Sequence, residues 1–263
     1  MNPLTRRQML ASSGMAALSA VPVLAATGAP ETDAAPVARL KILVAGGHPG
    51  DPEAGCGGTI ARYTALGHAV TVLYLTRGEA GVTGKSSAQA AEVRSAEARK
   101  ACGILKATPL FASQIDGATE VTAARYAEFD KLIAGVNPDV VFTQWPVDNH
   151  RDHRACALLA YDAWVRSGQK FALYYYEVDL GSDTQCFKPT HYVDVTQTEA
   201  AKRAACMAHQ SQNPNGFYLK DHVPMLRFRG MERGCKFAEG FIHHDQSPGG
   251  PLPGRIAEAV FSG

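Results

Sequence analysis

Short apolar runs alternate with segments of helical periodicity along most of this chain. The runs contain few polar residues, which is typical of strands buried on both faces of a sheet. They cover residues 40–45, 70–75, 109–112, 140–142, 171–176 and 191–195. Apolar residues recur at helical spacing in segments 57–66, 87–105, 123–134, 150–165 and 198–209. This alternation predicts an α/β fold, a Rossmann-like three-layer sandwich with a mostly parallel sheet between two layers of helices.

The N-terminal residues follow a different pattern. Arg6 and Arg7 precede a weakly apolar run that ends in Val23-Leu24-Ala25, which suits a small-residue cleavage site. Serines dilute this run, whereas a membrane-spanning helix needs about 20 strongly apolar residues. We therefore predict a twin-arginine export signal at 1–26, a flexible linker at 27–38 and one folded domain at 39–263. The protein should be periplasmic or secreted, without stable membrane insertion.

The chain without its signal is nearly neutral. The whole sequence has 26 Lys and Arg against 25 Asp and Glu, and removal of the two arginines of the signal leaves 24 against 25. A nucleic-acid-binding domain usually carries a clear excess of basic residues. This balance argues against nucleic acid as a partner.

Histidine and acidic residues gather directly after two of the predicted strands. The first group follows the strand at 40–45 and the second follows the strand at 140–142. These residues are His48, Asp51 and Glu53, and His150, Asp152 and His153. Asp148 or Asn149 can cap the helix that begins at 150. Because ligands bind outside the carboxyl ends of parallel strands, both groups should contribute to one site. Two imidazoles and one carboxylate, with a position left for water, form a usual ligand set of a hydrolytic zinc ion.

Three of these segments resemble motifs of a known family. Gly47-His48-Pro49-Gly50-Asp51, Gly57-Gly58-Thr59 and His150-Arg151-Asp152-His153 are similar to motifs of the PIG-L or LmbE-like family of N-acetylglucosaminide deacetylases. Segment 75–81 is similar to the family's second strand-end loop. The resemblance runs from about residue 40 to the helix after His153 and is thin beyond Gly168. It implies a metal-dependent hydrolase that removes the acetyl group from an N-acetylated amino sugar or glycan.

The resemblance also implies roles for individual residues. By position, His48, Asp51 and His153 would hold Zn²⁺, and His150 would stabilise the oxyanion. Asp152 would orient its partner imidazole. Arg77 and Arg94 are candidates for contacting the substrate, although Arg94 can equally be a solvated helix residue.

Gly50 departs from the family pattern, which has an aspartate at this position as the general base. General base catalysis contributes about 10²- to 10⁴-fold, so hydrolysis should be slow unless another group takes this role. Glu53, Asp148 or a carboxylate on the substrate could do so, and the sequence favours none of them. The alternative function is a catalytically silent homologue that binds zinc or carbohydrate.

The glycines of Gly55-Cys56-Gly57-Gly58 lie in the same part of the chain. They lack the spacing of a phosphate-binding loop, which argues against a nucleotide-binding domain. We expect them to form a tight turn that lets the following helix approach the metal-binding loop.

Overall fold

The computed structural model describes residues 38–179 and 183–254. The predicted signal, and the predicted linker up to residue 37, lie outside the described residues. The described chain contains a seven-stranded sheet in the order β3-β2-β1-β4-β5-β7-β6. The strands are β1 (Lys41–Gly46), β2 (Ala69–Tyr74), β3 (Thr108–Phe111), β4 (Val140–Gln144), β5 (Ala172–Tyr176), β6 (His191–Asp194) and β7 (Ala238–His243).

Five neighbouring strands of the sheet run parallel. β1 pairs in parallel with β2 and β4, β2 pairs with β3, and β4 pairs with β5. β7 runs antiparallel to β5 and to β6, so the sheet is mostly parallel, as predicted. In β1, Ile42 and Val44 face one core while Leu43 and Ala45 face another. Burial on both faces explains why this strand is continuously apolar.

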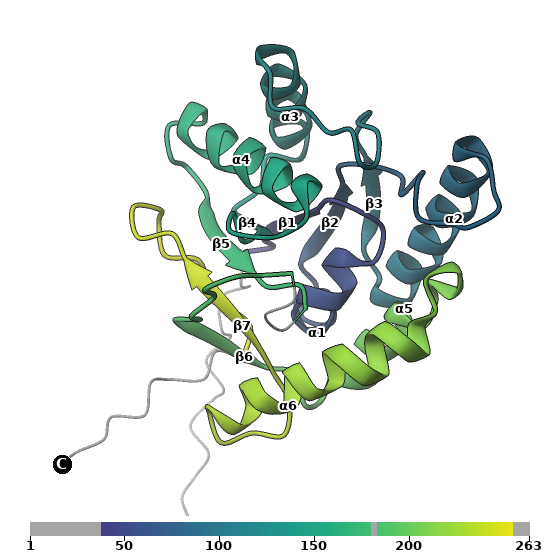
Figure 1. Ribbon diagram of the computed structural model, residues 1–263. Coiled ribbons are helices and arrows are strands. Elements are labelled where there is room, and N and C mark those ends of the chain that lie inside the picture. The colour runs from purple at the N-terminus through teal and green to yellow at the C-terminus, as the bar shows by residue number, and fades with distance from the viewer. Residues whose placement is uncertain (1–37, 180–182, 255–263) are drawn as a thin grey trace, which may run out of the picture. The chain divides into compact units, whose positions relative to one another are not determined.

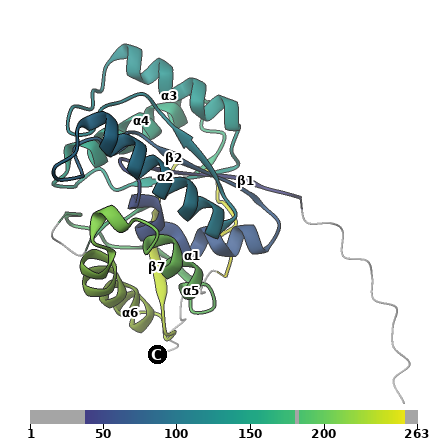
Figure 2. The same ribbon diagram turned by 90° about the vertical axis from the view of Figure 1, so that its right-hand side faces the viewer.

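Helices cover both faces of the sheet (Figures 1 and 2). One core contains side chains from α1 (Asp51–Ala65), α2 (Ser87–Leu105), α5 (Glu199–Cys206) and α6 (Val223–Met231). The other core contains side chains from α3 (Ala123–Val136) and α4 (Arg151–Arg166). Two cores on opposite faces of one sheet confirm the predicted three-layer sandwich.

Helix α1 begins at Asp51, so the prediction of a helix that starts at residue 57 after a tight turn is wrong. The chain enters the helix directly after Gly50, with a proline near its start and Asp51 and Glu53 in its first turn. The glycines therefore lie inside the helix. A Cβ at Gly55 would lie 2.2 Å from a ring carbon of Tyr176, and a Cβ at Gly58 would lie 2.6 Å from Val195. The glycines thus let α1 approach the surrounding elements closely.

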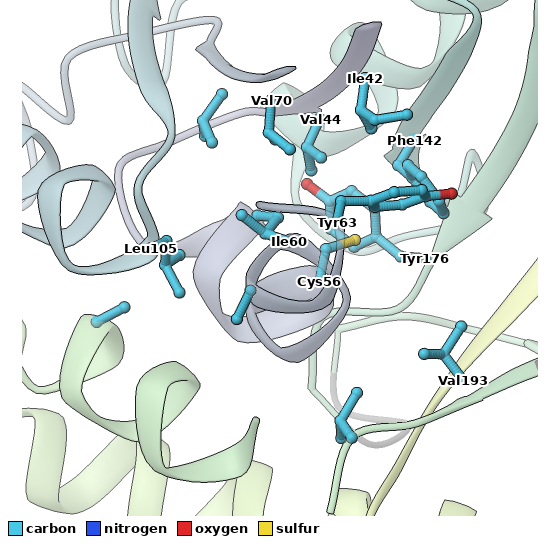
Figure 3. Close-up of a cluster of buried hydrophobic side chains, with 14 of the residues drawn as sticks. Ile42, Val44, Cys56, Ile60, Tyr63, Val70, Leu105, Phe142, Tyr176 and Val193 are labelled. Atoms are coloured by element: carbon cyan, nitrogen blue, oxygen red, sulfur yellow. The ribbon is translucent and has the colours of Figure 1, made fainter. Parts of the chain in front are cut away.

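The buried side chains of α1 fix the helix against the sheet. Figure 3 shows Cys56, Ile60 and Tyr63 of α1 lying against apolar side chains of the strands. Cys56 and Ile60 are fully buried, and Tyr63 is nearly so. Because Asp51 is the first residue of this helix, the same packing determines where its carboxylate lies.

The segment after β5 contains elements that we did not predict. They are the short 3₁₀ helix η1 (Gln210–Gln212), the π-helical segment η2 (Asn215–His222), α6 and β7. No helix in the described ranges is long and apolar enough to cross a membrane.

Candidate metal centre and active site

A cavity of about 410 Å³ contains most of the predicted site residues. β1 and β4 are neighbours in the sheet although the chain passes through β2 and β3 between them, and such a switch point is where open α/β sheets bind ligands. The predicted residues in the cavity wall are His48, Asp51, His150, His153 and Arg94. The wall therefore brings together residues that follow β1 and residues that follow β4.

The carboxylate of Asp51 lies between two imidazoles. Its Oδ2 is 3.1 Å from Nδ1 of His48 and 3.2 Å from Nε2 of His153. Gln144 at the end of β4 donates to the same oxygen at 3.1 Å. Burial opposes ionisation of Asp51, but His153 and His48 outweigh burial and hold its pKa well below the ordinary value. Asp51 is therefore a carboxylate at neutral pH.

Each of these imidazoles also contacts a carboxylate through its other nitrogen. Nε2 of His48 lies 3.0 Å from Oδ2 of Asp152, and Nδ1 of His153 lies 3.1 Å from Oδ1 of Asp148. Metal-bound histidines usually have such an outer carboxylate, which fixes the ring and raises its basicity. Burial lowers the pKa of His153, but Asp51 and Asp148 outweigh burial and raise it to about 9. In the metal-free protein Asp51 and Asp148 thus favour a protonated, positively charged His153 ring.

The donor set fits a metal ion. One nitrogen from each of His48, His150 and His153 can be chosen so that all lie within 4.8 Å of one another. Asp51 adds a carboxylate oxygen between His48 and His153. A second group consists of His48, Asp116, His150 and Asp152. Histidine nitrogens together with carboxylate oxygens suit a divalent transition metal such as zinc.

His150 lies beside these residues with a different pattern of contacts. It is the N-cap of α4, so the prediction of Asp148 or Asn149 as the cap is wrong. Its ring stacks on that of His153 with the centroids 4.7 Å apart. Nδ1 accepts a hydrogen bond from the backbone N–H of Asp152 at 3.3 Å, so a neutral ring carries its proton on Nε2. Burial and the rings of His48 and His153 lower the pKa of His150, which favours this neutral form.

Two arginines were predicted to contact the substrate. Arg94 is buried in the cavity wall, where its Nη2 donates to the carbonyl oxygen of Pro49 at 2.6 Å. It is therefore not a solvated helix residue. Arg77 is exposed and lies outside the described cavity wall.

The two protein carboxylates considered as substitutes for the missing base lie outside the described cavity wall. Glu53 is fully buried and accepts hydrogen bonds from the Tyr74 hydroxyl at 2.5 Å and the Gly50 N–H at 3.1 Å. Asp148 contacts His153 and accepts a hydrogen bond from the backbone N–H of His150 at 2.7 Å.

Sequence reasoning missed several residues of the cavity wall, among them Asp116 and His209. Asp116 lies 3.2 Å from Nε2 of His48, and His209 lies just beyond α5. Asp116 follows the carboxyl end of β3, so its position after a predicted strand was a usable signal. His209 ends a predicted helix without a motif, and no local signal marks it.

Comparisons with known proteins agree with this site. Residues 43–164 match the family described as PIG-L, GlcNAc-PI de-N-acetylase. The chain is 28% identical over 218 residues to a diacetylchitobiose deacetylase of Thermococcus kodakarensis, covering 76% of this chain and 81% of that protein. A conserved protein of Thermus thermophilus has a similar structure, with a TM-score of 0.68 and 30% identity over 81% of this chain and 95% of its own. The 4-carboxy-2-hydroxymuconate hydratase of Pseudomonas putida shares the fold, with a TM-score of 0.69 and 22% identity over 81% of this chain and 100% of its own.

Proposed function

Because this chain belongs to the PIG-L, or LmbE-like, family, we propose that it is a zinc-dependent N-deacetylase. Its substrate is an N-acetylated amino sugar or a glycoconjugate that contains one. Hydrolysis of the acetamide releases acetate and leaves a free amine on the sugar.

The proposal rests chiefly on the paired contacts of two imidazoles. His48 and His153 each approach Asp51 with one nitrogen and an outer carboxylate with the other. We assign these three residues as the zinc ligands, with Asp152 orienting His48 and Asp148 orienting His153. Zinc supplies a Lewis acid that polarises a carbonyl and lowers the pKa of water.

His150 has the contacts needed to stabilise the oxyanion of the tetrahedral intermediate. The neutral ring carries its proton on Nε2, because Nδ1 accepts from the backbone. An N–H donor held beside the reacting carbonyl can stabilise negative charge that develops on the oxygen. Arg94, the one arginine or lysine among the residues described in the wall, is available to bind a polar group of the substrate.

We further propose that the reaction takes place outside the cytoplasm. Arg6 and Arg7, the weakly apolar run after them and the small residues at 23–25 support a twin-arginine signal. Replacing both arginines with lysine should leave the protein in the cytoplasm, as measured by cell fractionation, while the native chain reaches the periplasm or the medium. Equal export of the two would contradict this part of the proposal.

Gly50 favours a second candidate, a homologue that binds zinc or carbohydrate without hydrolysing it. The family's general base is an aspartate at this position, and a glycine cannot accept a proton through its side chain.

Acetate release separates the two candidates. The full chain, loaded with zinc, is incubated with N-acetylated mono- and oligosaccharides beside its His153→Ala and Gly50→Asp variants. Acetate release by the native chain that is lost in His153→Ala supports the deacetylase. Activity in Gly50→Asp alone supports the silent homologue. If the native chain binds zinc but neither it nor Gly50→Asp releases acetate, the deacetylase proposal is contradicted.

A further inference from the structure

The position of Gly50 leaves a space beside a proposed zinc ligand. Gly50 has φ 111° and immediately precedes Asp51. Apart from its two chain neighbours, a Cβ built at Gly50 would have only two ring atoms of His209 within 4 Å, Cγ at 3.9 Å and Cδ2 at 4.0 Å. The imidazole of His209 therefore borders the space in which a side chain at residue 50 would lie.

His209 is buried without the hydrogen bonds that a structural histidine normally makes. It is 0% exposed and belongs to the cavity wall. Neither ring nitrogen makes a hydrogen bond among the described residues, and Nε2 only approaches the carboxylate of Glu53. Most buried polar atoms in proteins are hydrogen-bonded, so an imidazole without hydrogen bonds at the wall of a reactive cavity needs an explanation. Proton transfer at this cavity provides one.

Glu53 lies behind His209. Its Oε1 is 3.3 Å from Nε2 of His209 and accepts the Tyr74 hydroxyl, while Oε2 accepts the Gly50 N–H. The Glu53 side chain is fully buried, and a buried carboxylate is stabilised by a neighbouring positive charge. An imidazole at this distance becomes that counter-ion when it takes up a proton.

Two other groups in the described wall are also candidates for proton transfer. Asp116 contacts Nε2 of the proposed ligand His48 at 3.2 Å. His222 resembles His209, with Nε2 3.0 Å from Asp179 and Nδ1 without a hydrogen-bond partner, but neither group lies within 4 Å of a Cβ at Gly50. Asp183 is a third candidate, because burial and the neighbouring aspartates Asp179, Asp148 and Asp51 raise its pKa. It does not border the space at Gly50 within 4 Å, whereas His209 does.

We propose that His209 is the proton acceptor of the hydrolysis and that Glu53 is its positioning residue. This inference rests on the proposed deacetylase function. As the oxygen of the attacking water bonds to the acetamide carbon, one O–H bond of that water breaks. The proton passes to the His209 imidazole, directly or through one water in the space at Gly50. The same proton then passes to the sugar nitrogen as the C–N bond breaks, and the amine and acetic acid leave.

His209→Gln tests the assignment. The variant should lower kcat by about 100-fold or more, in the range of general base catalysis, and change KM by less than about threefold. Zinc content and zinc affinity, measured by metal analysis and chelator competition, should match the native chain, because His209 is not a proposed ligand. His244→Gln is the control. Nε2 of His244 is also buried without a hydrogen-bond partner in the described chain, but His244 lies outside the cavity wall, so kcat should remain native.

A kcat of His209→Gln within about threefold of the native value would overturn the inference, as would a large loss in Asp183→Asn alone. If His209→Gln loses zinc or its fold, the Glu53→Gln variant tests the inference in its place. This near-isosteric change should lower kcat by a smaller factor with KM and zinc affinity unchanged, and a native kcat would overturn the inference. A native chain that binds zinc but releases no acetate would instead overturn the proposed function and, with it, any proton transfer.

Discussion

Replacing Asp152 with asparagine should weaken zinc binding without unfolding the protein. Asp152 is fully buried and contacts His48 through Oδ2 at 3.0 Å. The same carboxylate accepts hydrogen bonds from the Gly117 N–H at 2.7 Å and the Thr119 hydroxyl at 2.6 Å. An asparagine has nearly the same shape and can keep these three contacts by directing its oxygen toward His48 and Gly117 and its amide toward Thr119. The substitution therefore removes the negative charge and little else.

The size of the expected loss in zinc affinity follows from the role of the Asp152 charge. Loss of an outer carboxylate behind a zinc-bound histidine typically costs about 10- to 100-fold in metal affinity, which is about 1.4–2.7 kcal/mol. A second effect acts in the opposite direction. Burial lowers the pKa of His48, but neighbouring aspartates, Asp152 among them, raise it well above its usual value. Without the negative charge of Asp152, His48 releases its proton more easily, so zinc competes with that proton more easily at low pH. The loss of affinity should therefore be smallest at acidic pH and grow as the pH rises.

The assay is competition with a chromophoric zinc chelator at several pH values, with thermal unfolding as the check on the fold. Thr119→Val is the matched control, because it removes one hydrogen bond from the same carboxylate and leaves its charge unchanged. Its zinc affinity should remain within about threefold of the native value, well below the 10- to 100-fold loss of an outer carboxylate. Native zinc affinity of Asp152→Asn at every pH would refute the reasoning. An equal loss in Thr119→Val would show that hydrogen bonding matters and the charge does not.

Three further predictions concern protons, a buried ion pair and the glycines of α1. Burial lowers the pKa of His153, but its two aspartate partners raise it to about 9, so zinc must displace a proton below that pH. The apparent zinc affinity should then rise at least about tenfold per pH unit from about pH 6 to about pH 9, and a flat profile in the chelator assay would contradict this. Lys202 and Glu239 are buried with Nζ and Oε1 2.6 Å apart, so Lys202→Met should cost about 3–5 kcal/mol in urea unfolding, and adding Glu239→Gln should recover part of the loss. If the losses of stability from the two substitutions are strictly additive, Lys202 and Glu239 do not stabilise each other. Gly58→Ala should cost about 1–3 kcal/mol because its Cβ would meet Val195 at 2.6 Å, whereas Gly103→Ala in α2, with nothing within 4 Å, should stabilise the protein by about 0.4–1 kcal/mol.

The sequence pattern predicted the parallel half of the fold because its signals are local. The strands β1 and β4 are buried on both faces, so their apolar runs are visible without knowledge of the partners. The start of α1 was not predictable in the same way. Its glycines suggested a turn. They are instead needed for close contacts with Tyr176 and Val195, which lie more than a hundred residues away along the chain. β7 was missed because its mixed sequence AEGFIH lacks regular alternation.

The candidate site divides similarly into predictable and unpredictable parts. His48, Asp51, His150 and His153 could be found because their motifs follow strands that the pattern identifies. The contact of Asp152 with His48 depends on how the loop after β4 meets the loop after β1, which no spacing reveals. His209 carries no motif, and its relation to Gly50 arises only because α5 packs against α1.

The proposed site draws its residues unevenly from the chain. The proposed ligands and their outer carboxylates all lie within residues 43–164, the segment that matches the family. Other residues of the cavity wall come from the later part of the chain, among them Asp183, His209, Phe217 and His222. In the proposed mechanism the residues after β1 and β4 would hold the metal, while the segment after α4 supplies His209, which takes the proton of the attacking water. Gly50 has no side chain that can accept a proton, and we propose that His209, from the later segment, accepts it instead.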